Sequence, residues 1–157
     1  MGSRPVVEML SGRECRGYLA QVGIGRVAVT IDALPAIYTV PFVLDGEHLL
    51  IRVGQRSALR RALTGSVVAF SADRFDESKE DSWSVLVRGV GEEVSDEALA
   101  VSLRALPLRS FGEAPERDCF VRLPLTQTSG TRAHRPEGGG VGRRTKPRLE
   151  AGCRVPA

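Results

Sequence analysis

Apolar and polar residues alternate in several short segments of this chain, and that period predicts β-strands. In the stretch RVAVTID, residues 26–32, every second residue from Val27 to Ile31 is β-branched. The next segment, AIYTVPFVL at 36–44, is rich in β-branched and aromatic residues and predicts a second strand. Four further strands are predicted at 48–53, 66–72, 83–94 and 119–123.

Helix signals are fewer than strand signals, and each predicted helix is short. Residues 11–14, SGRE, form a capping box before a helix predicted at about 12–21. Ser57 caps a second helix that Gly65 ends, and Asp96 starts a third. We therefore predict that strands form the core of the fold and that the short helices lie at its periphery.

The connections between the predicted strands indicate how the strands pair. Most strand pairs have no helix between them, which disfavours a doubly wound parallel sheet. Tight turns such as DGE at 45–47 favour antiparallel hairpins. We therefore predict a mainly β fold with minor α structure, a six-stranded antiparallel barrel, because a barrel closes its edges with little chain length.

Two features interrupt this pattern. Pro41 lies inside a predicted strand, so we expect an edge, a bulge or a point where the ladder opens. Residues 73–81, DRFDESKED, carry seven charges in nine positions and predict a solvated loop at the tip of a hairpin.

Composition limits the classes of protein that this chain can belong to. Of the 157 residues 42% are hydrophobic and only 5% aromatic, so the core is aliphatic. No run approaches the roughly 20 apolar residues of a membrane helix, and no secretory signal is apparent at the N-terminus. None of the cysteines, Cys15, Cys119 and Cys153, forms a C-x-x-C pair, and two histidines are too few for a metal site. We therefore expect a cytoplasmic protein without disulfides or bound metal.

The net charge of +3 is unevenly distributed. Residues 1–124 carry 15 basic and 17 acidic side chains, a sum of −2, whereas residues 125–157 carry seven basic and two acidic ones, a sum of +5. From 132 to 157 the sequence is rich in Gly, Pro and Arg and has no apolar period. We predict a folded domain at 1–131 and a disordered basic tail at 132–157. The tail has no aromatic residue for stacking on bases, which argues against a nucleic-acid partner.

One stretch combines groups that suit an anion. In RVGQRSALRRAL, residues 52–63, Arg52 ends a strand, Gly54 lets the chain turn, and Ser57 starts a helix. A helix start presents unpaired N–H groups and a partial positive charge. The residues alone leave two interpretations open, a phosphate cradle or an ordinary strand–helix junction.

Four segments together resemble the flavin-binding split-barrel family related to pyridoxamine 5′-phosphate oxidase, especially its short actinobacterial members. They are LSGRECRGYLAQVGIGRVAVTIDALPAIYTVPFVLDG, HLLIRVGQRSALRRALTGSVVAFSAD, SWSVLVRGVGEEVSD and VRLPLTQTSGTR. The resemblance spans about residues 10–132 and rests on their order and spacing. It implies a six-stranded split barrel that forms a homodimer, with one flavin mononucleotide (FMN) in each of two clefts at the dimer interface.

The resemblance also implies which residues hold the cofactor. Arg52 and Ser57 would bind the flavin phosphate, with Ala58 next to them. Backbone around Val40, Pro41 and Phe42, and around Val53 and Gly54, would line the isoalloxazine ring. Trp83 and Ser84 would reach the flavin from the partner subunit.

This sequence departs from the family pattern at two of these positions. Ala58 stands where the family usually has a lysine, so one charge partner of the phosphate is absent, although Arg56, Arg60 and Arg61 are near in sequence. Pro41 stands where the family usually has an asparagine, so an amide and a backbone donor are missing.

Two functions follow from the resemblance, and a third from the tail. The first is an FMN-dependent oxidoreductase acting on an unidentified small molecule, in which the cofactor performs the redox chemistry, so that no catalytic residue can be named. A deazaflavin is an alternative cofactor. The second is a non-catalytic barrel that carries or senses a flavin, deazaflavin or haem, or has lost its ligand. The third is a nucleic-acid accessory role of the tail.

Overall fold

The computed structural model describes residues 4–105 and 118–135. Within them it contains three short helices, α1 (Gly12–Leu19), α2 (Ala58–Leu63) and α3 (Glu97–Arg104). It also contains nine strands, β1 (Val6–Leu10), β2 (Ile24–Ile31), β3 (Leu34–Asp45), β4 (His48–Gly54), β5 (Val67–Asp76), β6 (Asp81–Val90), β7 (Glu92–Glu93), β8 (Asp118–Pro124) and β9 (Gln127–His134). The predicted mainly β fold with a few short helices is confirmed.

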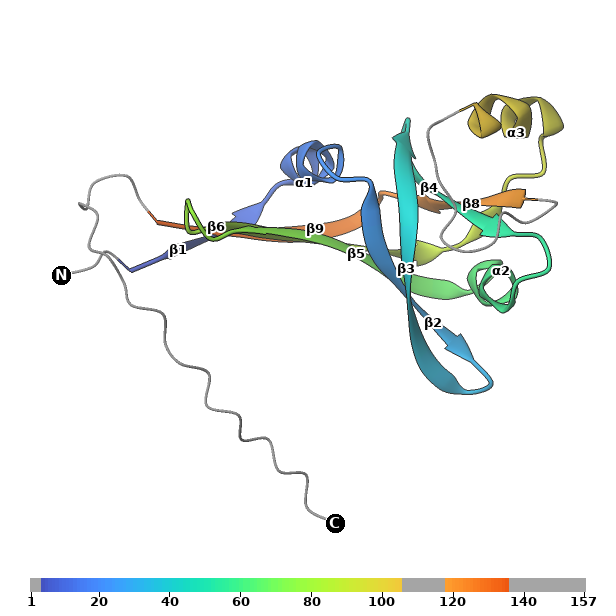
Figure 1. Ribbon diagram of the computed structural model, residues 1–157, viewed down its shortest axis with the longest axis horizontal. Helices are drawn as coiled ribbons and strands as arrows, with labels where there is room; N and C mark the ends of the chain where they lie inside the picture. The colour runs from blue at the N-terminus through green and yellow to red at the C-terminus, as the bar shows by residue number, and fades with distance from the viewer. Residues whose placement is uncertain (1–3, 106–117, 136–157) are drawn as a thin grey trace, which may run out of the picture.

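The nine strands form one sheet in the order β1-β9-β6-β5-β2-β3-β4-β8-β7, and neighbouring strands in it run antiparallel. Figure 1 shows β1, β9, β6 and part of β5 as an extended end, while β2, β3, β4 and β8 curl at the other end. The curl brings β8 close to β6, but no ladder joins them. The barrel is therefore split rather than closed by strand pairing.

The predicted number of six strands is too low. β7 has only two residues and follows a break at Gly91, and β1 and β9 were not predicted as separate strands. Four of the five residues of β1 are exposed, so β1 shows no inside–outside alternation. β9 is mostly polar and places Gly130 on its buried face. Neither strand carries the apolar period on which the prediction depends.

Two predicted boundaries also change. The charged segment 73–81 is mostly strand, because β5 runs to Asp76 and the ladder of β5 and β6 continues to Asp76 and Asp81. The charged residues indicate that the side chains of this segment are exposed to solvent. They do not indicate that its backbone lies outside the sheet. β9 extends to His134, which pairs with Val6, so the folded part reaches past the predicted boundary at 131. The predicted disorder of the rest of the tail concerns residues outside the described part.

The predicted helix caps are confirmed. The Ser11 side chain accepts a hydrogen bond from the Glu14 N–H, and the Ser11 N–H donates to the Glu14 carboxylate, which completes the capping box. Ser57 caps α2 and Asp96 caps α3 through backbone N–H groups of the first turn. These signals are local in sequence, so they do not depend on the tertiary fold.

Pro41 marks a change of partner strand. β3 pairs with β2 as far as the pair Ile24 and Pro41, and from Phe42 onward it pairs with β4. The Phe42 N–H donates to the Gly23 carbonyl at 3.0 Å. Of the three outcomes expected for Pro41, the structure shows an opening of the ladder.

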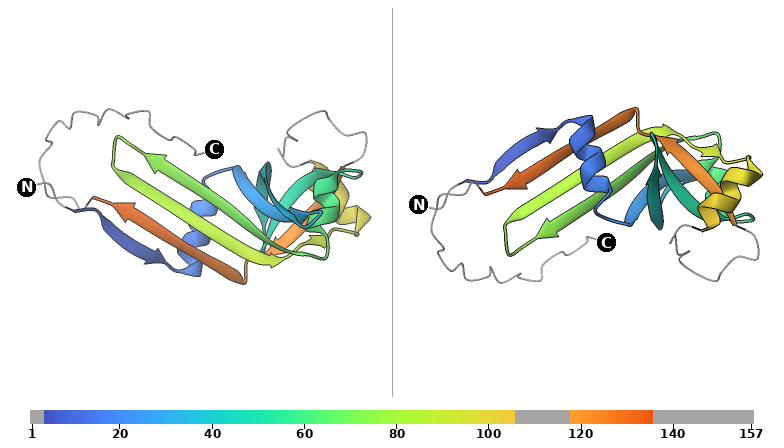
Figure 2. Two further views of the ribbon diagram at one scale, coloured as in Figure 1. Left: turned by 90° about the horizontal axis from the view of Figure 1, so that it is seen from below. Right: turned by 90° about the horizontal axis from the view of Figure 1, so that it is seen from above.

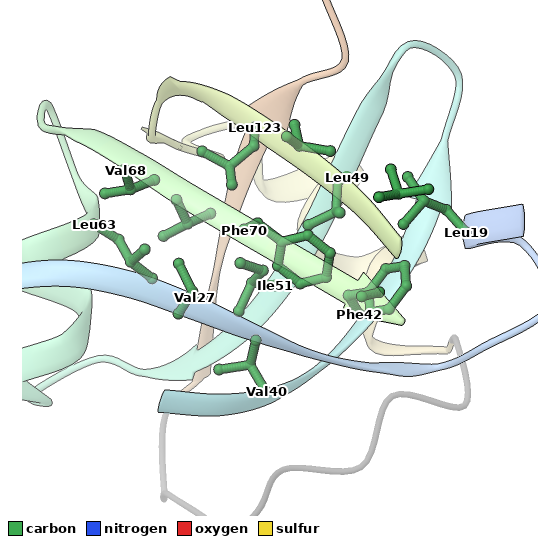
Figure 3. Packing of buried hydrophobic residues seen from close by; sticks show 14 of the residues in the cluster. Leu19, Val27, Val40, Phe42, Leu49, Ile51, Leu63, Val68, Phe70 and Leu123 are labelled. Atoms are coloured by element: carbon green, nitrogen blue, oxygen red, sulfur yellow. The ribbon is translucent and has the colours of Figure 1, made fainter. Parts of the chain in front are cut away.

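Two apolar clusters hold the sheet together. The main core lies inside the curl and is built from aliphatic side chains with Phe42 and Phe70 in edge-to-face contact (Figure 3). It continues under α1, which crosses one face of the sheet (Figure 2). A smaller cluster joins Leu50 and Phe120 to Leu103 of α3. β4 and β8 are thus covered on both faces, by the core on one and by α3 on the other.

No helix in the described residues is long and apolar enough to cross a membrane.

Candidate functional site

The predicted phosphate-binding arginine lies on the α3 face of β4. In the ladder of β4 and β8, Arg52 is opposite Phe120 and Gly54 is opposite Asp118. Arg52 and Asp118 are therefore diagonal neighbours on one face of the sheet. The Arg52 guanidinium contacts Oδ2 of Asp118 through both Nε and a terminal nitrogen.

The carboxylate of Asp118 is almost completely removed from solvent. Its side chain is 6% exposed, against 24% for Arg52. Its second oxygen, Oδ1, is buried and has no hydrogen-bond partner among the described residues. A buried acceptor without a partner costs about 1–3 kcal/mol, so this oxygen has the capacity to accept a hydrogen bond from a bound molecule.

A pocket of about 690 Å³ opens beside this ion pair. β4, β7, β8, α3 and the segments next to them line it, with the residues Arg52, Gln55, Glu93, Val94, Ser95, Glu97, Ala100, Arg104, Asp118, Cys119 and Phe120. Its volume lies within the range of ordinary small-molecule sites.

Two further ion pairs border the pocket. Arg60 of α2 holds Glu93 through three contacts of 2.7–3.1 Å, and Arg104 holds Glu97 at 2.9 Å. The hydrogen bond to Glu93 is the main reason that the pKa of Arg60 is raised. With Arg52 and Asp118, three arginines face three carboxylates, so these three pairs are formally neutral.

The start of α2 is held rigidly next to this pocket. The Ser57 Oγ accepts from the Arg60 N–H at 3.1 Å, and the Ser57 N–H donates to the Gly54 carbonyl at 3.0 Å. Arg60 and Arg61 donate to the carbonyls of Gln55 and Arg56, at 3.0 and 3.2 Å. Of the arginines expected to replace the missing lysine, Arg60 is already engaged by Glu93 as well.

Cys119 lies beside this network. Its thiol points to the Val53 carbonyl at 3.7 Å. Burial is the main cause that raises the pKa of this thiol, and the Glu93 carboxylate adds to the effect. Cys119 is therefore a protonated thiol at neutral pH rather than an activated nucleophile.

The other predicted site residues divide into two groups. Val40, Phe42, Val53 and Trp83 have their side chains in the main core, and Pro41 is buried beside them. These residues can offer a ligand their backbone atoms rather than their side chains. The Trp83 ring packs on Tyr18 of α1, with ring centroids 5.2 Å apart.

Trp83 and Ser84 lie on β6, and three strands separate β6 from β4 in the sheet. Of the predicted site residues, only Arg52 is among the described residues that line the pocket, whereas Val40, Phe42, Val53 and Trp83 meet in the main core. Ser84 is exposed on the sheet face opposite Trp83. Its predicted contact with a flavin stays a prediction that requires a second copy of the chain.

Sequence reasoning missed the residues that complete the pocket, above all Asp118, Glu93 and Arg104. Asp118 is 66 residues from Arg52 along the chain and is the first residue of the short strand β8. No periodic signal in the sequence connects the two. Among the described residues, no group of three or more His, Cys, Asp or Glu side chains is arranged to hold a metal ion.

Comparison with known proteins gives a consistent family assignment. The sequence profile of the family described as pyridoxamine 5′-phosphate oxidase matches residues 11–132. An uncharacterized protein of Mycobacterium tuberculosis is 41% identical over 102 residues, a match that spans 60% of this chain and 64% of that protein. This chain therefore matches less than two thirds of the length of that relative.

Two solved structures share the fold. A protein from Mycobacterium smegmatis described as FAD-binding is 32% identical, with a TM-score of 0.68, over 82% of this chain and 98% of its own. A putative pyridoxamine 5′-phosphate oxidase from Corynebacterium glutamicum is 25% identical, with a TM-score of 0.70, over 83% of this chain and 96% of its own.

Proposed function

The chain belongs to the pyridoxamine 5′-phosphate oxidase family, and we propose that it binds a flavin nucleotide whose phosphate lies between Arg52 and the start of α2. One observation carries the proposal: Arg52 lines a pocket of about 690 Å³ next to the rigid turn that leads into α2. The Mycobacterium smegmatis protein with 32% identity is described as FAD-binding, which supports a flavin.

In the proposed complex the residues of this chain bind and orient the cofactor. Arg52 supplies a planar pair of donors to a phosphate oxygen, and backbone N–H groups after Gly54 face the same region. The backbone of β3 next to Pro41 and of β4 at Val53 lines the ring. A bound flavin supplies hydride or single-electron transfer, which the described side chains do not provide. FMN is the smallest flavin with a phosphate, and it is the cofactor named in the sequence-based prediction.

We propose a homodimer as part of this function. On the sheet face opposite the main core, five apolar side chains of β2, β3, β5 and β6 are exposed by 43–79%, namely Ile24, Ile37, Val67, Phe75 and Val90. Exposed apolar patches of this kind typically mark association surfaces. Ser84 lies on the same face, so a second copy packed there would bring Ser84 to the edge of a shared site.

With the flavin in place, we propose an oxidoreductase that acts on an unidentified small molecule over the open face of the ring. The departures at Ala58 and Pro41 favour a second candidate, a protein that carries a flavin without turnover. Both candidates require flavin binding, and they differ in whether the bound flavin is reduced by a donor such as a nicotinamide cofactor and reoxidised by a substrate.

Flavin binding can be tested by titration of the purified protein with FMN and with FAD, followed by flavin fluorescence, together with light scattering for the oligomeric state. We expect saturable binding by a dimer. The variant Ala58→Lys restores the positive charge that the family pattern has at the start of α2, so it should tighten binding by roughly tenfold, the effect of one charge-assisted hydrogen bond.

The matched control is Ala20→Lys, which adds the same charge at the exposed end of α1, remote from the pocket. Equal effects of the two lysines would place the phosphate elsewhere. Absence of binding by the wild-type protein at millimolar flavin would refute the proposed function.

A further inference from the structure

Asp118 changes what the proposed phosphate site can accept. A site for a doubly charged phosphate normally offers an excess of positive groups. Here the arginine that faces the pocket is already paired with a carboxylate whose side chain is only 6% exposed. The other two arginines beside the pocket, Arg60 and Arg104, are paired with Glu93 and Glu97, so none of these three ion pairs carries an excess positive charge.

A phosphate that reaches Arg52 also comes close to the carboxylate of Asp118. The two groups are diagonal neighbours on one sheet face and share a direct contact. At such short range in a partly buried site, Coulomb repulsion lowers affinity by roughly one power of ten or more for each negative charge on the ligand. The penalty for a dianion is therefore larger than the penalty for a monoanion.

The unpaired oxygen of Asp118 adds to the conflict with a phosphate. Oδ1 is buried without a hydrogen-bond partner among the described residues. An ionised phosphate has only acceptor oxygens and cannot satisfy Oδ1. A ribityl hydroxyl can donate to it, but FMN and FAD share these hydroxyls, so the difference between the two flavins rests on the charge of the phosphate.

We infer that Asp118 makes this pocket select a singly charged phosphate group, such as each phosphate of the FAD pyrophosphate, over the doubly charged phosphate monoester of FMN. The inference rests on the proposed function, because it concerns the same site. Asp118 acts as a positioning and specificity-determining residue through Arg52. It requires no contact of Asp118 with the flavin ring.

The test compares the affinities of FMN and FAD in the wild-type protein and in Asp118→Asn at pH 8. The substitution removes one negative charge and keeps the shape of the side chain. The affinity for FMN should rise more than the affinity for FAD, because the phosphate of FMN near Arg52 carries one more negative charge. We expect the ratio of FMN affinity to FAD affinity to rise roughly tenfold. Contacts of the adenosine part cancel in this comparison of ratios.

The matched control is Asp45→Asn, which removes a carboxylate at the exposed end of β3, outside the described lining of the pocket. Its ratio of affinities should equal that of the wild type. An unchanged ratio in Asp118→Asn, with both flavins bound, would overturn the inference and leave the proposed function intact. Failure of the wild-type protein to bind either flavin would overturn both.

A second measurement needs no variant and so does not depend on the folding of Asp118→Asn. The phosphate of FMN loses its second proton near pH 6, whereas the pyrophosphate of FAD keeps its charge. FMN affinity should therefore fall relative to FAD affinity between pH 5.5 and 8. The groups that face the pocket are the three arginine–carboxylate pairs and the Cys119 thiol, whose pKa is raised. No histidine lines this pocket. A ratio that stays constant over this pH range would contradict the inference.

Discussion

Two arginine–aspartate pairs at opposite ends of the sheet have the same local design and different outcomes. At the extended end, Asp81 lies two residues before Trp83, and Arg132 is opposite Trp83 in the ladder of β6 and β9. At the curled end, Asp118 lies two residues before Phe120, and Arg52 is opposite Phe120. In both places an aspartate two positions before an aromatic residue meets the arginine across the strand pair.

The hydrogen bonds of the two pairs differ. Arg132 donates from two nitrogens to the two oxygens of Asp81, at 2.9 and 3.0 Å, so both oxygens are satisfied. The contacts of Arg52 with Asp118 both go to one carboxylate oxygen, and the other oxygen of Asp118 is left without a partner in the described part of the chain. The Asp81 side chain is 28% exposed and that of Asp118 only 6%. In the first pair both carboxylate oxygens have partners and the aspartate is in contact with water. In the second pair one carboxylate oxygen has no partner among the described residues, and the aspartate is almost fully buried.

The difference teaches that the register of paired strands determines which residues meet, while the layers packed around them determine what the contact does. β6 and β9 run beyond the core at their outer end (Figure 1), so Asp81 keeps contact with water. β4 and β8 are covered by α3 on the face that carries Asp118. The same pair therefore acts as a structural clamp at one end and as part of a pocket at the other.

The largest expected consequence is on stability. Arg52→Ala leaves the buried carboxylate of Asp118 without its cation, which typically costs about 3–5 kcal/mol. Arg132→Ala leaves Asp81, which water reaches, so the cost should be roughly 1 kcal/mol. Urea denaturation at pH 7.5 measures both free energies of unfolding.

The double variant Arg52→Ala with Asp118→Ala serves as a control for the first. It leaves no buried charge, so it should be more stable than Arg52→Ala alone, a coupling that the double-mutant cycle detects. Equal losses for the single variants at the two ends would remove the contrast between the two pairs.

Much of this fold was predictable from local signals, and the pocket was not. The helix caps at Ser11, Ser57 and Asp96 depend on residues within one turn, and the central strands carry a clear apolar period. β9 was missed because its sequence is polar and its contact with the core is made through Gly130, where an added Cβ would lie 2.8 Å from the Cys15 sulfur. A glycine that packs closely gives no apolar signal.

The site shows the same limit. Arg52, Gly54 and Ser57 were predictable as a group, because they are neighbours in sequence at a strand–helix junction. The partnership of Arg52 with Asp118 depends on the register of β4 and β8, across 66 residues of chain. The 6% exposure of the Asp118 side chain depends on tertiary packing around the end of β8. Neither quantity can be read from the order of residues.

The second prediction uses cysteines to compare access at the two ends. Cys15, on the buried face of α1, is 0% exposed, whereas Cys119, next to Asp118, is only partly buried. In a Cys153→Ser background, a maleimide at pH 7.5 should modify Cys119 at least about tenfold faster than Cys15, because the reagent reaches an open thiol without unfolding the protein. Mass spectrometry of time points after digestion measures both rates.

Burial raises the pKa of both thiols, so both reactions should accelerate between pH 7 and 9 while their order stays the same. The variant Cys119→Ser identifies the fast site. Should Cys15 react first, the end of the sheet with the complete ion pair would be the more open one, and the contrast in access would be reversed.

The smallest expected effect concerns the pH dependence of the complete pair. The hydrogen bond from Arg132 is the main cause that lowers the pKa of Asp81 below its ordinary value of 3.8. A carboxyl whose pKa is lower in the folded state stabilises the fold above its ordinary value, and this stabilisation is lost as the pH falls through the folded value. Asp81→Asn should therefore lower the free energy of unfolding by roughly 1 kcal/mol or less at pH 7, and by nothing once Asp81 is protonated in both the folded and the unfolded state.

Urea denaturation of the wild type and of Asp81→Asn at pH 7 and at about pH 2 measures this loss of stability at each pH. Asp45→Asn, at an exposed position at the end of β3, is the matched control. A cost of Asp81→Asn that is the same at both pH values would mean that the charge of Asp81 contributes nothing, and the clamp would then owe its effect to shape alone.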